Sequence, residues 1–574
     1  MAWRTGVASA AVAAALLGSS IAHGADAPAY DLLIRDGVIY DGSGGEAYRG
    51  DIAISGDKIV AVGKSVPGTA RQVVDANGLA VAPGFINMLS WATESLLIDG
   101  LGQSDLRQGV TLEVMGEGWS MGPLNDRMKK EAVQQQGDFK FPIEWTTLGE
   151  YLKLVEKRGT TMNVASYVGA TTVRQHELGD GDVDPTPEQL GRMRALVRQA
   201  MEEGALGVGT SLIYPPAAFA ETDELVALTT EAANCGGSYI SHMRSEGDRL
   251  LESIDELIEI SRRSGAPAEI YHLKQVGRSN WGKIDAVIAK IEAARAEGLK
   301  ISADMYTYTA GGTGLAASMP PWVQDGGVDA MLERLKDPAT VERIKKEMVQ
   351  PGSNWENLYN HAGPDRVLLA SLTDPSLKPL IGKTVAEVAK MRGVSPEQAV
   401  IDLVLADKGR IGAIYFLMNE DNVRRQAALP WVSFGSDAEA SAPEGIFLKN
   451  STHPRAYGNF ARFLGKYVRD EKVVPLAEAV RRLTSLPAGN LGLRDRGQLK
   501  PGMVADVVLF DPAAIGDHAT FEKPMQYSTG VRDVFVNGVQ VLKGGAPTGA
   551  KPGRFVKGAG WTGWPGGGAC HKAG

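Results

Sequence analysis

Short apolar runs alternate with amphipathic segments through the middle of the 574-residue chain. The clearest example is residues 238–306, where three runs rich in β-branched and aromatic residues, 238–242, 268–274 and 301–306, end in polar groups. The segment between the first two runs has acidic residues in its first turn, basic residues in its last and aliphatic residues at helical spacing, namely Leu250, Leu251, Ile254, Leu257 and Ile258. This order predicts parallel strands joined by crossover helices.

Strand-like runs of this kind occur eight times. They cover residues 81–88, 111–116, 163–168, 207–211, 239–242, 269–272, 301–306 and 431–437. Helical patterns separate most of them, so the chain is predicted to form an α/β fold, a (β/α)8 TIM barrel, over residues 83–494. The long gap before the last strand is charged and helix-like over about 329–407, which predicts an insertion near the active-site face.

The two ends of the chain share a different pattern, with short alternating strands at 28–82 and again at 495–550. In the second segment, Asn537 and Gly538 are a strong signal for a hairpin. We expect these distant segments to form one small β-sandwich, with the barrel inserted between them. Residues 551–574 are rich in glycine and are expected to be a flexible tail.

The N-terminus has the pattern of a secretory signal. Residues 1–24 contain one basic residue, Arg4, then an alanine-rich apolar run and small residues before Ala25. The run is short for a membrane span. We therefore expect a cleaved signal peptide and a periplasmic or secreted protein with no membrane span in its mature form. An uncleaved anchor is the alternative.

Composition narrows the class of protein. With 44% apolar and 22% charged residues, the chain can bury a large core. A net charge of -8 and a pI near 5.7 provide no basic surface for nucleic acid. Cys235 precedes an apolar strand and Cys570 lies in the tail, so neither a disulfide framework nor a thiolate metal cluster is indicated. No pattern specifies the oligomeric state.

His242 and His272 end two successive predicted strands. In a parallel barrel the carboxyl ends of the strands converge on the active site. The two imidazoles can therefore share one metal ion. A single histidine at a strand end is more often a hydrogen-bonded structural residue, and this alternative stays open for each of the two.

Eight motifs occur in a fixed order along the chain. They are VAPGFI at 81–86, GALGVGTSLIYPP at 204–216, SHMRSE at 241–246, HLK at 272–274, ADMYTYTA at 303–310, GSD at 435–437, HPRAYG at 453–458 and LTSLPA at 483–488. In this order they resemble the N-acyl-D-amino-acid deacylase (D-aminoacylase) family of the amidohydrolase superfamily, from about residue 30 to residue 541. The resemblance implies a barrel capped by a β-sandwich.

The resemblance also implies roles for five residues. His242 and His272 match the family's zinc-binding histidines, and Asp437 matches its catalytic acid/base. Tyr306 and Arg455 match the residues that hold the substrate carboxylate, for which a planar guanidinium is well suited. Each has a structural alternative, because an aspartate can cap a helix, an arginine can pair with an acid and a tyrosine can fill a core.

Arg244 and Lys274 lie just beyond the two histidines in the sequence. We expect them to contact the substrate or to support the metal ligands. Solvated surface charge is the alternative for both.

The sequence departs from the superfamily pattern at the first two strands. Leu89 and Trp91 occupy the positions of a His-x-His pair, and neither side chain can bind a metal ion. Gly118 aligns with a cysteine of related deacylases, and the adjacent Glu117 offers a carboxylate oxygen, which binds zinc at about 2.0–2.2 Å. Other divalent ions suit the same donors. The hypothesis is one Zn²⁺ per chain, bound by Glu117, His242 and His272. For Glu117, the alternative is a solvated group or one that supports the ligands without binding the ion.

These observations favour a zinc-dependent amide hydrolase that acts on a small molecule. It would remove the acyl group from an N-acyl amino acid of the D series, or cleave a peptide-like amide. A non-catalytic periplasmic binding relative is the alternative that the lost first-strand histidines favour. A cyclic amidase of the hydantoinase kind also fits the barrel, although residues that hold a free carboxylate argue against it.

Overall fold

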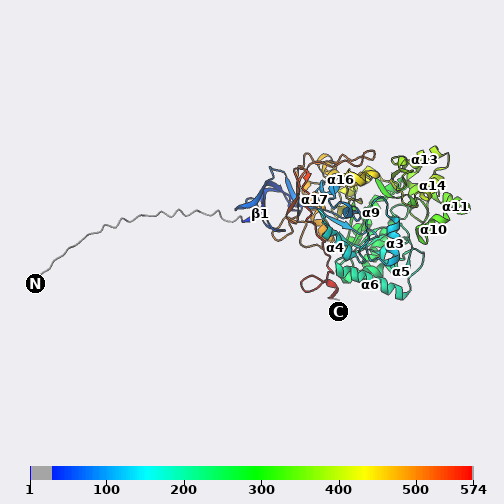
Figure 1. Ribbon diagram of the computed structural model, residues 1–574, viewed down its shortest axis with the longest axis horizontal. Coiled ribbons are helices and arrows are strands. Elements are labelled where there is room, and N and C mark those ends of the chain that lie inside the picture. The colour runs from blue at the N-terminus through cyan, green and yellow to red at the C-terminus, as the bar shows by residue number, and fades with distance from the viewer. Residues whose placement is uncertain (2–28, 572–574) are drawn as a thin grey trace.

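A computed structural model describes Met1 and residues 29–571 (Figure 1). Apart from Met1, the predicted signal segment at residues 1–24 lies outside the described residues. A closed parallel barrel occupies the centre of the molecule. Its strands are β6 (Phe85–Asn87), β7 (Val110–Met115), β8 (Asn163–Ser166) continuing as β9 (Val168–Gly169), β10 (Gly207–Ser211), β11 (Ser238–His242), β12 (Ala268–Ile270), β13 (Ile301–Met305) and β17 (Val432–Phe434).

Parallel pairing runs through β9, β10, β11, β12, β13 and β17, and separately through β6, β7 and β8. The first and last strands close the ring, since the Met88 amide donates to the Phe434 carbonyl at 3.1 Å. All eight predicted strands are present among the described residues, and the predicted fold class is confirmed. The polar carboxyl ends of the strands therefore surround one opening.

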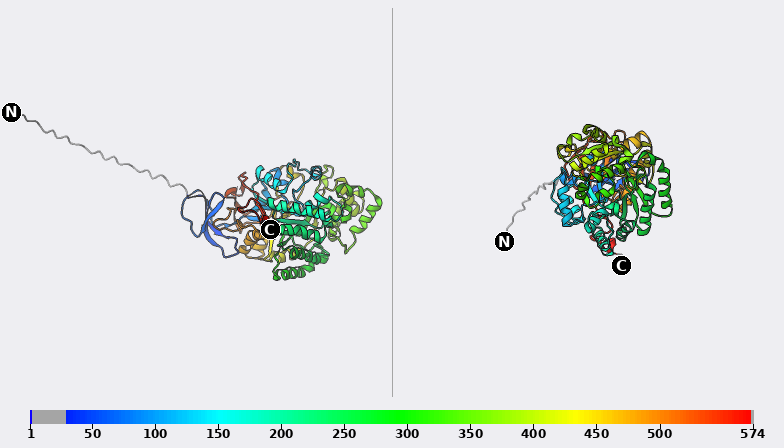
Figure 2. Two further views of the ribbon diagram at one scale, coloured as in Figure 1. Left: turned by 90° about the horizontal axis from the view of Figure 1, so that it is seen from below. Right: turned by 90° about the vertical axis from the view of Figure 1, so that its right-hand side faces the viewer.

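Helices cover the outside of the barrel, as Figure 2 shows. Helix α8 illustrates why they form: Leu250, Ile254 and Leu257 are buried, and the helix ends at Gly265, whose φ of 75° is costly for other residues. The main covering helices are α4 (Leu148–Arg158), α5 (Ala170–Leu178), α6 (Pro187–Glu203), α7 (Thr222–Asn234), α8 (Leu250–Ser264), α9 (Ile284–Ala296), α15 (Glu420–Ala427), α16 (Arg455–Arg462) and α17 (Leu476–Leu483).

A β-domain built from both ends of the chain lies beside the barrel. Strand β18 pairs antiparallel with β5, bringing Leu509 opposite Val81. The hairpin between β19 and β20 turns at Asn537 and Gly538, both with positive φ, as predicted. The strands are β1 (Tyr30–Ile39), β2 (Tyr48–Ser55), β3 (Lys58–Gly63), β4 (Ala70–Asp75), β5 (Ala80–Pro83), β18 (Val507–Phe510), β19 (Val531–Val536), β20 (Val539–Lys543) and β21 (Ala546–Pro547).

An insertion between β13 and β17 lies at the end of the molecule opposite the β-domain (Figure 1). It begins before the predicted residue 329, with a three-stranded antiparallel sheet of β14 (Ala310–Gly314), β16 (Gly412–Phe416) and β15 (Val367–Ser371). Strand β14 contains three glycines and gives little strand signal. The insertion has its own apolar core and the helices α10 (Gly327–Arg334), α11 (Pro338–Met348), α12 (Leu358–Ala362), α13 (Val385–Arg392) and α14 (Pro396–Ala406).

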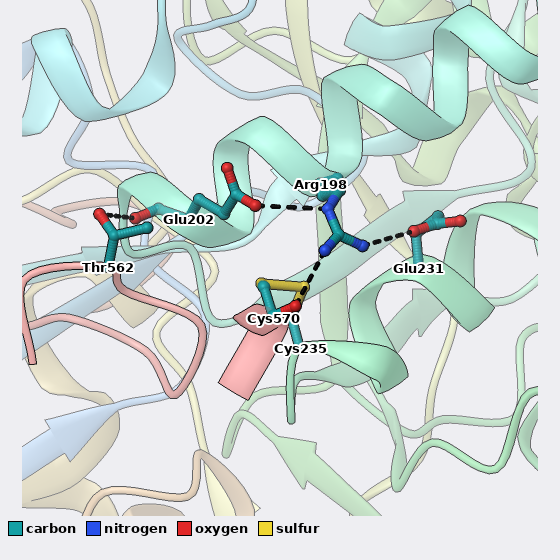
Figure 3. Close-up of a disulfide and its surroundings, with 6 residues drawn as sticks. All are labelled: Arg198, Glu202, Glu231, Cys235, Thr562 and Cys570. Atoms are coloured by element: carbon teal, nitrogen blue, oxygen red, sulfur yellow. Dashed lines mark hydrogen bonds and ion pairs between the residues drawn. A yellow bond between two sulfur atoms is a disulfide. The ribbon is translucent and has the colours of Figure 1, made fainter. Parts of the chain in front are cut away.

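The C-terminal segment differs from the predicted flexible tail. Up to residue 571 it packs along the barrel, where the Val164 amide donates to the Arg554 carbonyl at 3.0 Å. Phe555 is buried, and Cys570 forms a disulfide with Cys235 at the end of α7 (Figure 3). Glycine-rich composition predicts flexibility only for a free chain, and these contacts with distant residues remove that freedom.

Among the described residues, no helix combines the length and apolar character needed to cross a membrane.

Candidate metal centre and substrate cavity

Three buried side chains bring donor atoms together at the carboxyl end of the barrel. Glu117 follows β7, His242 ends β11 and His272 follows β12. The Glu117 Oε1 atom lies 3.0 Å from His242 Nδ1 and 2.9 Å from His272 Nε2. Donor atoms of all three residues lie within 4.8 Å of one another. The structure thus brings together the three predicted ligands.

The backbone is strained at two positions of the site. His272 has a φ of 34° and Asp437 a φ of 49°, a region that non-glycine residues rarely occupy. Each position is held from a neighbouring strand: the His272 amide donates to Asp304 Oδ1 at 2.9 Å, and the Asp437 amide to the Leu89 carbonyl at 2.8 Å. Strain of this kind persists where surrounding contacts enforce it and is concentrated at functional sites.

Glu246 and Lys274 lie behind the two histidines. Glu246 Oε1 is 3.0 Å from His272 Nδ1, and Glu246 Oε2 is 3.6 Å from His242 Nε2. The Lys274 Nζ atom lies 2.6 Å from Glu246 Oε1 and lines the cavity. Carboxylates in this position orient metal-binding imidazoles and raise their basicity.

The acids make this site favourable for a positive charge. Burial and Lys274 lower the pKa of His272, but Glu246 and Glu117 outweigh them and raise it to about 10. Burial raises the pKa of Glu117, yet the two imidazoles hold it below its usual value. Two imidazoles and a carboxylate also form a donor set of the catalytic zinc type. These residues fit a divalent metal ion.

The opposite wall carries the predicted acid/base. Asp437 Oδ2 is 2.8 Å from Arg455 Nη1. Burial raises the pKa of Asp437, although Arg455 opposes the shift. The guanidinium of Arg455 lies 4.5 Å from the centre of the Tyr306 ring, and its Nε atom is buried without a hydrogen bond in the described part of the chain. An unused buried donor of this kind suits a carboxylate ligand.

These groups line one cavity of about 720 Å³. This volume is within the range of small-molecule sites. Residues of the insertion, including Gly312 and Tyr415, complete its wall. Aromatic and apolar side chains surround the charged centre, among them Trp91, Trp119, Ile213, Tyr214 and Phe447.

Arg244 lies outside this cavity, contrary to its predicted contact with substrate. Its guanidinium forms a two-point contact with Glu256, at 2.9 Å for each pair of atoms, and donates to the Ala218 and Ala220 carbonyls. These four contacts join Arg244 to α8 and to residues 218–220, which gives it a structural role. Proximity to His242 in the sequence does not indicate whether the Arg244 side chain points into the cavity or away from it.

Sequence reasoning missed the contact of Trp91 with Glu117. The indole Nε1 donates to Glu117 Oε2 at 2.8 Å. Gly118, the residue aligned with a cysteine, has a φ of 73°, and a β-carbon there would lie 2.4 Å from Ser211 Cβ. Position 118 therefore has no room for a side chain, and the donor at this strand end is Glu117.

The fold and site together define a class, the metal-dependent hydrolases with a (β/α)8 barrel. A family model described as the amidohydrolase family matches residues 72–542. D-aminoacylase of Alcaligenes xylosoxydans xylosoxydans is 34% identical over 539 residues, covering 92% of this chain and 98% of the relative. The chain belongs to the amidohydrolase family, and within it to the N-acyl-D-amino-acid deacylases.

Solved structures agree with this membership. One is a D-aminoacylase studied for the role of its binuclear metal centre, which is described as one-metal activation and second-metal attenuation. It has a TM-score of 0.76 at 31% identity. The match covers 92% of this chain and all of that one. A second solved structure is N-acyl-D-glutamate deacylase from Bordetella bronchiseptica in complex with zinc and a phosphonate mimic of the tetrahedral intermediate. It has a TM-score of 0.74 at 29% identity, and the match covers 92% of this chain and 99% of that one.

Proposed function

We propose that the protein is a zinc-dependent deacylase of N-acyl-D-amino acids, with one metal ion per chain. The observation that carries the proposal is the convergence of Glu117, His242 and His272 across one cavity from the Asp437–Arg455 pair. A bound zinc ion would supply Lewis-acid polarisation of the scissile carbonyl and activation of water. Glu117, His242 and His272 would hold it.

The residues of the chain supply the proton transfers and the orientation of the substrate. Asp437 takes a proton from the attacking water, whose oxygen bonds to the acyl carbon. When the C–N bond breaks, Asp437 returns this proton to the departing nitrogen, so the products are a carboxylic acid and a free amino acid. Arg455 and Tyr306, with Lys274 beside them, hold the substrate carboxylate and place the amide against Asp437.

The first test combines elemental analysis with a hydrolysis assay on the purified mature protein. N-acetyl-D- and N-acetyl-L-amino acids with matched side chains are assayed before chelation, after chelation and after addition of zinc. We expect about one zinc per chain, faster hydrolysis of the D series, loss of turnover on chelation and recovery with one equivalent of zinc. Bound zinc without turnover of any substrate would favour a binding protein. Hydrolysis of cyclic amides alone would favour a hydantoinase-like enzyme.

We propose, separately, that the protein acts outside the cytoplasm. The signal pattern of residues 1–24 supports export, and the Cys235–Cys570 disulfide suits an oxidising compartment. Fractionation of the source cells, with N-terminal sequencing of the mature chain, tests this. The expected start is Ala25, and an intact N-terminus in the cytosolic fraction would contradict the proposal.

A further inference from the structure

The two oxygens of Glu117 have different partners. Oε1 faces His242 and His272, at 3.0 and 2.9 Å. Oε2 accepts a hydrogen bond of 2.8 Å from the Trp91 indole. Glu117 is 4% exposed, so its carboxylate has limited contact with solvent. The Trp91 indole thus engages Oε2, and Oε1 is the oxygen that faces the two imidazoles.

Three residues that follow the first and last barrel strands, Leu89, Trp91 and Asp437, are poorly suited to bind a second ion beside Glu117. Leu89, two residues before Trp91, is fully buried in the barrel core, where a β-carbon on Gly435 would lie 2.7 Å from Leu89 Cβ. Asp437 is paired with Arg455 at 2.8 Å, so its nearest positive charge is a guanidinium. Leu89 is thus apolar, Trp91 donates an N–H to Glu117 and Asp437 is paired with Arg455.

We propose that Trp91 is a positioning residue for the metal site: its indole N–H engages Glu117 Oε2, leaves Oε1 as the single metal-facing oxygen, and excludes a second ion. The inference rests on the metal site of the proposed function and adds a residue to it. Hydrogen bonds to a ligating carboxylate fix its orientation and contribute to metal affinity. As a consequence, excess zinc should not lower the activity of this enzyme. This would contrast with the D-aminoacylase described by one-metal activation and second-metal attenuation.

The test measures zinc binding, so it does not depend on knowing the substrate. Metal-free wild-type protein and Trp91→Phe are titrated with zinc sulfate against a competing chelator, and the zinc per chain is measured by elemental analysis. Phenylalanine keeps the aromatic ring but removes the N–H. We expect one zinc per wild-type chain even in excess zinc, and binding weaker by about 10–100-fold in Trp91→Phe.

Trp119→Phe is the matched control. Trp119 lines the same cavity, but in the described part of the chain its indole makes no hydrogen bond to Glu117. We expect Trp119→Phe to keep the wild-type zinc affinity. Equal losses in both variants would overturn the inference, because they would reflect general disturbance of the cavity. Wild-type affinity and stoichiometry in Trp91→Phe would also overturn it.

A double variant tests the exclusion of a second ion. Leu89→His with Trp91→His supplies two imidazoles, and we expect about two zinc ions per chain. The wild-type titration remains informative if this variant does not fold, since two zinc ions per wild-type chain would contradict the inference directly. Failure of the proposed function has a different signature, namely absence of zinc binding or of turnover in the wild-type protein.

Discussion

At the scale of single residues, the proposed reaction depends on how Asp437 is held. Its amide is bound to the first strand, and its carboxylate is 2.8 Å from Arg455. It is not one of the three residues, Glu117, His242 and His272, whose donor atoms converge. The proposed proton transfer and metal binding therefore fall on different residues, and we expect that each can be removed without the other.

The variant Asp437→Asn should retain the metal and lose turnover. The amide has nearly the size of the carboxylate but cannot accept the proton of the water. We expect kcat to fall by about 10²–10⁴-fold, the usual contribution of general acid–base catalysis, with about one zinc per chain. Elemental analysis and steady-state kinetics check this. Loss of zinc together with activity would place Asp437 among the ligands.

Arg455 should set the pH dependence of Asp437. Burial raises the pKa of Asp437 and Arg455 opposes this, so loss of the positive charge raises the pKa further. A base must be deprotonated, and activity therefore falls as the pH drops through this pKa. In Arg455→Gln we expect the acidic limb of the kcat/KM profile at higher pH. Arg455→Lys, which keeps the charge, should leave the limb close to its wild-type position.

Glu246 should contribute to metal affinity without touching the ion. Its two oxygens lie 3.0 Å from His272 Nδ1 and 3.6 Å from His242 Nε2. Glu246→Gln removes the negative charge and should weaken zinc binding by about 10–100-fold. Chelator competition measures the loss.

Glu356→Gln provides a nearby control, because Glu356 Oε2 accepts from the Ser245 hydroxyl and the Glu246 amide, and neither contact involves a metal ligand. An equal loss of zinc affinity in the two variants would argue against the role assigned to Glu246.

At the scale of elements, much of the fold could be predicted because the signals are local. The strands that lead to His242 and His272 and the helix between them follow from apolar spacing and terminal charges. The segments that the sequence patterns do not predict correctly depend on distant contacts. Strand β14 is glycine-rich and exists because β16 pairs with it, and the C-terminal segment is ordered by hydrogen bonds to residues about 390 positions away.

The disulfide should anchor the C-terminal segment without affecting catalysis. Cys570 is buried against α6 and α7, where Arg198 donates to its carbonyl at 2.8 Å (Figure 3). Neither cysteine lines the cavity. We expect Cys570→Ser to lower the free energy of unfolding by about 2–4 kcal/mol, to expose residues 551–574 to protease and to leave kcat unchanged.

Limited proteolysis with mass spectrometry, thermal melting and kinetics measure these effects. Reductant should reproduce them in the wild-type protein and have no further effect on Cys570→Ser. A protease-resistant tail in the reduced protein would contradict the prediction.

At the scale of the whole molecule, both ends of the chain are needed for one domain. The buried residues Ile34 and Ile52 from the N-terminal strands share a core with Leu509 and Phe535 from the C-terminal strands. Strand β5, which leads directly into the barrel, pairs with β18. The domain can therefore form only when both segments are available.

Removal of residues 495–574 should abolish soluble expression. The truncation exposes the apolar faces of β1 and β5 and leaves the edge of β5 unpaired, a combination that promotes aggregation. Removal of residues 551–574 in the Cys235→Ser background keeps every strand of the β-domain and should remain soluble. The soluble fraction and its zinc content measure the outcome, and a soluble, zinc-bound product of the longer truncation would refute the prediction.

The sequence by itself determined the barrel, the β-domain made from both termini and the histidines that bind the metal in the proposal, because strand periodicity and strand-end motifs are local properties of the chain. Only the tertiary structure decided the direction of Arg244, the contact of Trp91 with Glu117, the pairing of Asp437 with Arg455 and the disulfide. Each of these depends on the position of a partner from a distant element. Such positions follow from the closure of the barrel and the packing of the insertion and tail, which no local pattern encodes.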